Sequence, residues 1–362
     1  MHIKTIQLKN YRCYEQAEIL PCEGVTALVG GNAQGKTNIL ESVVLCATGR
    51  SHRTSKDAEL IRWGAQDAHV YVAAERIDGS HEVELSLRPG VRKGISICGK
   101  KAARSGELMG HVSAVLFSPE DLRMVKDGPA ERRRFIDMEL SQMRPAYYYE
   151  LQRYNRAVTQ RNCLLRDVIE GKTSRETLMA WDMQLAKSGA AIIRARRGFL
   201  DKLAVVAAEN HRELTEGVET LQLQYAPGGP EDEQGYLEAL EKTMDMDIRR
   251  GSTGTGPHRD DLIFLVNDRD ARAFGSQGQQ RTVALSMKLS ELRVMKDEMG
   301  EWPALLLDDV MSELDPVRRR ALIARLKGVQ TMVSCTDMSD LAGADIGDIY
   351  WVSRGVLHRK EG

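Results

Sequence analysis

The sequence predicts an α/β fold interrupted by a helical insertion, and three observations support this prediction. Short apolar runs of strand length occur at residues 25–29 and 303–307. A glycine-rich loop at residues 30–37 separates the first run from a helical pattern. Long helical patterns dominate between about 125 and 250. We expect one discontinuous domain (1–124 and 251–362) around an inserted helical arm (125–250).

The first half of the chain alternates strand and helix patterns. Residues 1–8 and 25–29 are expected as strands, and apolar residues recur at helical spacing from Lys36 onward. A hairpin is expected over 69–87, turning at Asp78-Gly79-Ser80. A second extended pair near 94–101 and an apolar run at 115–117 follow. This order predicts a mixed sheet with an antiparallel part.

The second half begins with the helical insertion and returns to alternating elements. Glycine and proline break the helical patterns at 226–230, and a glycine-rich segment follows at 251–257. A strand is expected at 262–266 and a long amphipathic helix at about 279–299. The apolar run at 303–307 is typical of a buried parallel strand.

Composition excludes little. The net charge of −1 and the 42% hydrophobic content are ordinary for a globular protein, so nucleic-acid affinity would need local patches. The six cysteines form no Cys-x-x-Cys pair, which favours a reduced, cytoplasmic protein. Early charges argue against a signal peptide, and no apolar run has membrane-spanning length. No membrane partner is expected beyond a peripheral one.

The loop at 30–37 has the pattern Gly-x4-Gly-Lys-Thr of a phosphate-binding loop. Its residues are Gly30, Gly31, Asn32, Ala33, Gln34, Gly35, Lys36 and Thr37. The glycines let successive amide groups converge on phosphate oxygens, and the helix that follows adds its positive end. Lys36 is expected at the β- and γ-phosphates and Thr37 on Mg²⁺, so the cofactors predicted are ATP and Mg²⁺. The alternative is a chance match in a surface loop.

An acidic pair ends the predicted strand at 303–307. Asp308 is expected to hold Mg²⁺ through water, because Mg²⁺ retains part of its hydration shell. Asp309 is expected to orient or deprotonate the attacking water. The alternative is an acidic turn exposed to solvent.

A third segment, residues 275–281, opens the predicted long helix. Ser276, Gln277, Gly278 and Gln279 bring small and polar groups to a helix N-terminus, where anions bind. An ordinary N-cap, in which Ser276 caps the helix and Gln279 follows three residues later, would explain the same pattern.

The order of loop, Ser-x-Gly-Gln segment and Asp-Asp strand resembles the ABC-type ATPases, in which the serine-glycine segment is the signature motif. Residues 312–315 look like the D-loop of that class. The resemblance implies a head-to-tail homodimer, in which each signature segment covers ATP on the partner's loop. Asp309 stands where that class commonly has glutamate, and Thr336 roughly where it has histidine. These shorter groups predict slow hydrolysis.

Further segments resemble the RecF family of bacterial recombination mediators, which is related to the SMC ATPase heads. They are residues 8–12, 30–41, 49–54, 117–122, 131–137, 255–261 and 307–315. The resemblance implies a DNA-dependent ATPase that dimerises on ATP and acts at gaps and single-strand–double-strand junctions. Its implied partners are DNA, RecR and RecO, with RecA loaded downstream in repair, fork recovery and the SOS response. The alternatives are an ABC transporter ATPase subunit and a small-molecule kinase.

Residues alone argue weakly for DNA. Eight arginines face four acidic residues between 131 and 166, with tyrosines interleaved. A solvated helical face over packed tyrosines is the simpler explanation of this composition, so the DNA prediction depends on the family resemblance. We assign no catalytic role to His52, Arg53, His258 or Arg259.

Overall fold

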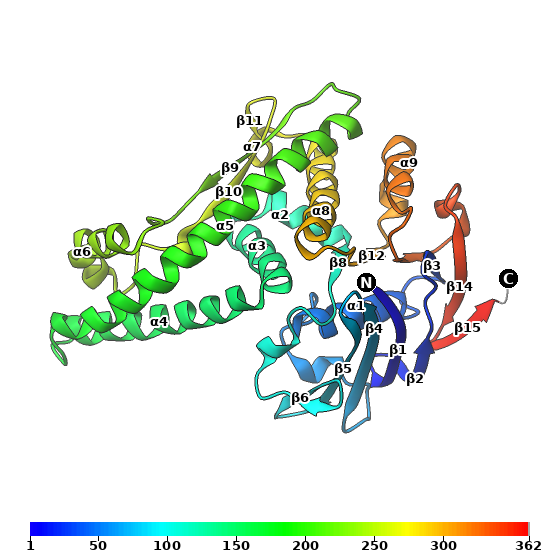
Figure 1. The fold of residues 1–362 in the computed structure, drawn as a ribbon, viewed down its shortest axis with the longest axis horizontal. Helices are drawn as coiled ribbons and strands as arrows, with labels where there is room; N and C mark the ends of the chain where they lie inside the picture. The colour runs from blue at the N-terminus through cyan, green and yellow to red at the C-terminus, as the bar shows by residue number, and fades with distance from the viewer. Residues whose placement is uncertain (361–362) are drawn as a thin grey trace. The chain divides into compact units, whose positions relative to one another are not determined.

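The computed structural model describes residues 1–360, which fall into two compact units (Figure 1). The first unit contains Met1–Asp121 and the chain from Lys288 onward, and the second is Leu122–Met287. The boundary between Met287 and Lys288 lies inside helix α8, Gln277–Met299.

Residues 251–287 belong to the second unit for two reasons. Strand β10 pairs with β9 in one antiparallel sheet, and Ser286 of α8 is hydrogen-bonded to His211 of the same unit. The domain boundaries expected at 124/125 and 250/251 remain a prediction about domain organisation.

The first unit is built on two six-stranded sheets. One has the order β2-β1-β4-β5-β6-β7, and its neighbouring strands are antiparallel. Its strands are β1 His2–Tyr11, β2 Tyr14–Ile19, β4 Ala68–Arg76, β5 Gly79–Arg88, β6 Val91–Ile97 and β7 Lys100–Lys101.

The other sheet has the order β15-β14-β3-β13-β12-β8 and is parallel from β14 to β8. Its strands are β3 Val25–Val29, β8 Ala114–Phe117, β12 Ala304–Asp308, β13 Thr331–Cys335, β14 Ile346–Ser353 and β15 Val356–Lys360. Because β3, β12 and β13 are adjacent and parallel, their carboxyl ends meet at one edge.

Helix α1, Lys36–Thr48, contacts strands of both sheets. Ile39, Leu40 and Val43 are fully buried, and no residue of the helix is exposed. It ends at Gly49, whose φ of 71° is left-handed, as at many helix C-termini. The only other α-helix wholly within the described part of this unit is α9, Pro316–Arg325, which Asp315 caps.

The second unit combines helices with a small antiparallel sheet of order β11-β10-β9. Its complete helices are α2 Leu122–Lys126, α3 Pro129–Met143, α4 Pro145–Ile169, α5 Met179–Leu214, α6 Glu233–Arg250 and α7 Ala271–Phe274. Its strands are β9 Leu221–Ala226, β10 Asp261–Val266 and β11 Arg269–Asp270. A proline opens α3 and another opens α4, at the position where the missing N–H has no helical partner.

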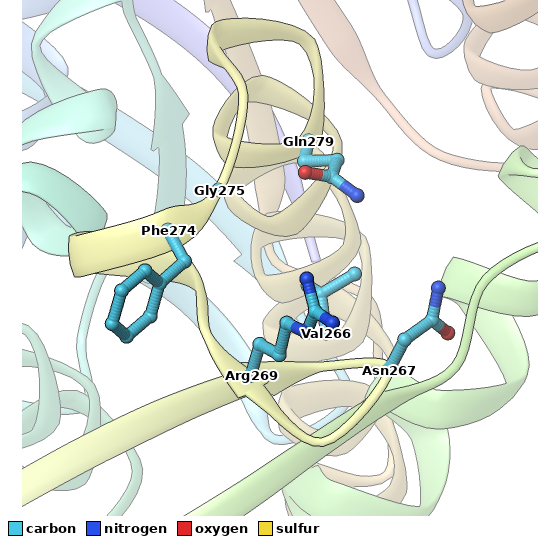
Figure 2. A pocket seen from close by; sticks show the side chains of 6 residues that line it. All are labelled: Val266, Asn267, Arg269, Phe274, Gly275 and Gln279. Atoms are coloured by element: carbon cyan, nitrogen blue, oxygen red, sulfur yellow. The ribbon is translucent and has the colours of Figure 1, made fainter.

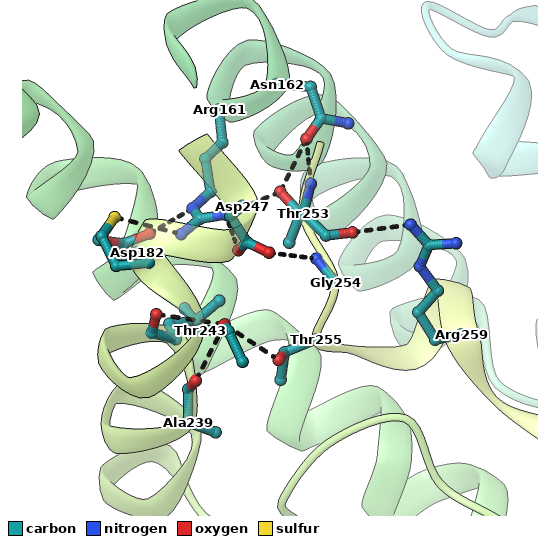
Figure 3. Close-up of polar contacts among 12 residues, drawn as sticks. Arg161, Asn162, Asp182, Ala239, Thr243, Asp247, Thr253, Gly254, Thr255 and Arg259 are labelled. Atoms are coloured by element: carbon teal, nitrogen blue, oxygen red, sulfur yellow. Dashed lines mark hydrogen bonds and ion pairs between the residues drawn. The ribbon is translucent and has the colours of Figure 1, made fainter. Parts of the chain in front are cut away.

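Buried ion pairs hold the long helices of this unit together. The Arg161 side chain on α4 is fully buried and lies 2.6 Å from both Asp182 on α5 and Asp247 on α6 (Figure 3). Thr253 accepts a third bond from the same guanidinium at 3.0 Å. A buried charge persists only when it is paired in this way.

A second buried arginine is centred on the segment at 256–261. Arg196 on α5 donates to Asp260 at 2.6 Å and to Asp137 on α3 at 2.7 Å. Asp260 also accepts from the Tyr225 hydroxyl at 2.5 Å and from the Gly228 amide at 2.6 Å. The Asp260 carboxylate therefore links α5, β9 and the glycine-proline turn at 226–230 through hydrogen bonds.

Candidate nucleotide-binding site

The glycine-rich loop connects the carboxyl end of β3 to α1. Gly35 immediately precedes the helix and has φ 119°, a backbone conformation that residues with a side chain rarely adopt. A Cβ there would lie 2.6 Å from Cys13 Sγ and 2.7 Å from the Tyr14 hydroxyl oxygen. The Tyr14 hydroxyl donates to the Gly35 carbonyl at 3.0 Å. The turn between β1 and β2 thus supports the loop and requires glycine.

The loop offers donors for an anion. Within residues 1–360, the backbone amides of residues 31–37 donate to no other protein group. The Lys36 ammonium folds back onto the loop, 2.5 Å from the Gly30 carbonyl oxygen and 3.1 Å from that of Gly31. Unpaired amides at a helix N-terminus beside an ammonium group are suited to bind phosphate oxygens.

The acidic strand end lies directly beside this loop. Thr37 Oγ1 donates to Asp308 Oδ1 at 2.8 Å, and Ser334 Oγ on β13 donates to the same oxygen at 2.8 Å. Ser334 Oγ also accepts the Asp309 amide at 2.9 Å. Two residues predicted as Mg²⁺ ligands, 271 positions apart in sequence, are therefore in direct contact.

The electrostatics of Asp308 suit a divalent cation. Burial raises the pKa of this carboxyl, the Asp309 charge adds to the rise, and the bonds from Ser334 and Thr37 oppose it. No ion pair joins Asp308 to a basic side chain within residues 1–360. A carboxylate and a hydroxyl in direct contact match the oxygen ligands that Mg²⁺ prefers.

Sequence reasoning missed Ser334, which holds both aspartates at the strand end. The available signal was a polar residue inside the apolar strand β13, Thr331–Cys335, directly before the predicted Thr336. Asp309 has φ 55°, a left-handed conformation that aspartate and asparagine tolerate. The bond from its amide to Ser334 fixes this turn.

A buried carboxylate in α1 organises the segment around Ser51. Glu41 accepts two bonds from Arg12, at 2.6 and 2.9 Å, and one from the Ser51 hydroxyl at 2.5 Å. Burial acts to raise the pKa of Glu41, but the bonds from Arg12 and Ser51 outweigh it, so the pKa is lowered. The exposed Arg53 donates to Asn38, next to Thr37, at 3.1 Å. These contacts place a guanidinium near the loop.

The signature-like segment lies in the second unit, at the start of α8. Ser276, Gln277 and Gly278 are exposed. The N-cap expected from the sequence is present, since Ser276 and Gln279 bond reciprocally. A cavity of about 350 Å³ adjoins it (Figure 2). Its lining residues are Val266, Asn267, Arg269, Phe274, Gly275 and Gln279.

The histidine of the 256–261 segment has a structural role. His258 lies 2.6 Å from the Tyr154 hydroxyl through Nδ1 and 3.0 Å from the Thr253 carbonyl oxygen through Nε2. Since the carbonyl can only accept, Nε2 carries the proton and Nδ1 accepts from tyrosine. Burial lowers the pKa of His258, which favours this neutral form.

Several members of the arginine-rich stretch are structural. Arg132 is buried against Asp261 at 2.6 Å, Arg133 donates to the Asp260 carbonyl at 2.7 Å, and Arg161 is the buried cation of Figure 3. Arg153 and Arg156 are among the exposed members. The alternative of tyrosines packed beneath a solvated face holds for Tyr147 and Tyr154, which are buried.

Comparisons with known proteins identify the family. The family model for the RecF/RecN/SMC N-terminal domain matches residues 2–346. A protein called DNA replication and repair protein RecF from Lachnospira eligens is 42% identical over 359 residues, covering 98% of each chain. A protein of the same name from Lachnoclostridium phytofermentans is also 42% identical, covering 99% of this chain and 100% of its own. The chain belongs to the RecF family.

Solved structures agree with this membership. A structure described as the recombination mediator protein RecF with ATP, in the RecFOR pathway, is 34% identical with a TM-score of 0.91. It covers 99% of this chain and 98% of its own. The Smc head domain of Pyrococcus furiosus, at 19% identity and a TM-score of 0.60, shows the fold alone. Its alignment covers 99% of this chain and 96% of that one.

The predicted fold class is therefore confirmed, because a RecF-type ABC ATPase head with mixed sheets and a helical region is what the structure contains. Among residues 1–360, no helix is both long and apolar enough to cross a membrane. RecF membership also removes the reason to consider the transporter subunit or the kinase.

Proposed function

We propose that this RecF-family chain binds ATP and Mg²⁺ at residues 30–37 and 308–309 and uses ATP to dimerise on DNA. The observation that carries the proposal is the 2.8 Å contact between Thr37 Oγ1 and Asp308 Oδ1 at the mouth of the loop. It joins the two halves of a magnesium-nucleotide site that the sequence separates. The related RecF structures described with ATP and with ATPrS support the choice of nucleotide.

Each residue of the site has a distinct role in this proposal. The amides of 31–37 and the Lys36 ammonium bind the phosphates, so Lys36 must leave the carbonyls of Gly30 and Gly31 when phosphate arrives. Thr37 and Asp308 hold Mg²⁺, which neutralises phosphate charge when bound. Asp309 orients the attacking water and accepts its proton. Its short side chain favours slow turnover, which suits a switch.

The second half of the site comes from another copy of the chain. Ser276, Gln277 and Gly278 are exposed at a helix N-terminus, where the Ser276 hydroxyl and the amides of Gln277 and Gly278 are available to an anion. In a two-fold head-to-tail pair, each copy presents this segment to ATP on its partner. ATP then lies in the interface and stabilises the dimer.

DNA is the proposed macromolecular partner. The support is membership of the RecF family and the similarity to structures of the recombination mediator protein RecF of the RecFOR pathway. On this basis the dimer acts at gaps and single-strand–double-strand junctions, with RecR and RecO, to help load RecA in the cytoplasm. Fork recovery and SOS induction follow from that role, and hydrolysis responds to DNA.

Two substitutions test the nucleotide-gated dimer. Lys36→Met removes the ammonium that binds phosphate, so ATP binding and dimerisation should both be lost. Ser276→Arg places a bulky cation on the signature segment, so the monomer should still bind ATP but no longer pair. Sedimentation velocity with ATP measures the pairing, and Ser174→Arg, at an exposed turn of the same unit, is the matched control. A Ser276→Arg protein that dimerises normally would exclude the sandwich.

The DNA part has its own experiment. ATP turnover and sedimentation are measured with no DNA, a single strand, a duplex and a gapped duplex at one salt concentration. A larger response to duplex or gapped DNA than to single strands is expected. Equal values in all four conditions would contradict a DNA-dependent ATPase.

A further inference from the structure

The signature serine forms one end of a chain of side-chain contacts within the second unit. The Ser276 amide donates to Gln279 Oε1 at 2.9 Å, and the Gln279 amide donates to Ser276 Oγ at 3.2 Å. This reciprocal pair is a capping box, which fixes the serine at the start of α8. The direction in which Ser276 points therefore depends on the Gln279 side chain.

Gln279 is held from its other side by Glu219. Gln279 Nε2 donates to Glu219 Oε1 at 2.9 Å, across 60 positions of sequence. A carboxylate only accepts hydrogen bonds and a backbone amide only donates them. Between these two groups the Gln279 amide has one permitted orientation, with its oxygen toward Ser276 and its nitrogen toward Glu219. A flipped amide would lose both bonds.

Glu219 is itself fixed to the end of the long helix α5. Its Oε2 lies 3.3 Å from Nε2 of His211, whose Nδ1 lies 3.1 Å from Ser286 Oγ on α8. His211 is fully buried. The turn after α5 is closed by the bond from the Gly217 amide to the Arg212 carbonyl at 2.8 Å. Glu219 thus has a defined position before it contacts Gln279.

We infer that Glu219 is a positioning residue for the signature segment, acting through Gln279 on Ser276. The inference rests on the proposed ATP-gated dimer, because it concerns the surface offered to the partner's nucleotide. Glu219 does not contact nucleotide in this scheme. It fixes the orientation of the Gln279 side-chain amide. That side chain in turn fixes the positions of the Ser276 hydroxyl and of the first free backbone amides of α8.

The test exchanges the two groups that make the contact. Gln279→Glu retains an acceptor for the Ser276 amide, as in a Ser-x-x-Glu capping box, but brings a second carboxylate against Glu219. We expect about a tenfold rise in the ATP concentration that gives half-maximal dimerisation, the scale of a lost hydrogen bond to a charged group. ATP affinity of the monomer should not change, since the phosphate loop lies in the other unit.

The double variant Glu219→Gln with Gln279→Glu restores an amide facing a carboxylate. The ATP concentration that gives half-maximal dimerisation should return to within about threefold of the value for the original chain. Independent sites would not show such a coupling. Glu209→Ala, an exposed glutamate of α5, is the control for loss of charge. Circular dichroism confirms that each variant is folded.

Two outcomes separate this inference from the proposed function. If Ser276→Arg abolishes pairing while Gln279→Glu and Glu219→Ala dimerise like the original chain, Glu219 has no positioning role and the inference is wrong. If Ser276→Arg itself dimerises normally, the sandwich fails first. A double variant as defective as Gln279→Glu alone would also overturn the inference.

Discussion

Removing the carboxylate of Asp260 tests whether the 256–261 segment is structural. The Asp260 side chain is fully buried and accepts from Arg196 at 2.6 Å, Tyr225 at 2.5 Å and Gly228 at 2.6 Å. In Asp260→Ala these donors lose their acceptor. Breaking a buried ion pair costs about 3–5 kcal/mol, and each buried neutral donor left unpaired costs about 1–3 kcal/mol.

The loss is smaller than that sum, because Arg196 keeps two acceptors. It still donates to Asp137 at 2.7 Å and to the Pro257 carbonyl at 2.6 Å. We expect Asp260→Ala to reduce the free energy of unfolding of the second unit by about 4 kcal/mol, a large fraction of the 5–15 kcal/mol typical of a domain.

Urea unfolding gives the free energy, and amide hydrogen exchange in β9 and β10 assigns the loss to this unit. Asp201→Ala, at an exposed position of α5, controls for removal of a negative charge. ATP binding at the phosphate loop should persist in the folded fraction. A loss below about 1 kcal/mol would refute the structural role and return the segment to the functional candidates.

Three further predictions concern the site and its pH response. Thr37→Val removes the hydroxyl that contacts Asp308. The gain in ATP affinity that Mg²⁺ produces, measured by calorimetry, should therefore fall about tenfold, while ATP affinity without metal is unchanged. Asp309→Asn keeps the left-handed turn, which asparagine tolerates, and should slow turnover at least about a hundredfold while the ATP-dependent dimer persists in sedimentation. His258 has a pKa below its usual 6.5, so the unfolded chain binds more protons and stability should fall as pH drops below about 6.5. His258→Gln should remove this part of the slope in urea titrations at pH 5 to 8, and an unchanged slope would contradict the burial argument.

The sequence was sufficient where local backbone chemistry defines the element. The phosphate loop needs glycine at position 35 and a helix directly after it, and both requirements are visible in consecutive residues. The capping box at Ser276 is equally local, because its two partners are three residues apart. The strands β3 and β12 were also predicted, since a buried parallel strand is apolar throughout.

The sequence was insufficient where the decisive partner lies far along the chain. Strand β9, Leu221–Ala226, was not predicted, although Leu-Gln-Leu-Gln-Tyr alternates apolar and polar residues, and it pairs with β10 some forty residues later. Strands β2, β14 and β15 and helix α6 were likewise not predicted as elements. Ser334 is one small polar residue whose role appears only when β13 lies beside β12.

The same distinction separates two kinds of arginine in the 131–166 stretch. Composition counts Arg161 and Arg156 alike, yet Arg161 is fully buried between two aspartates and Arg156 is exposed. A buried guanidinium with two carboxylates has no capacity left for a phosphate, whereas an exposed one keeps its donors. The capacity of this stretch to bind DNA is therefore smaller than its arginine count suggests. Within the proposed function, only the exposed members have donors left for DNA phosphates, and a substitution at Arg161 reports on folding rather than on DNA.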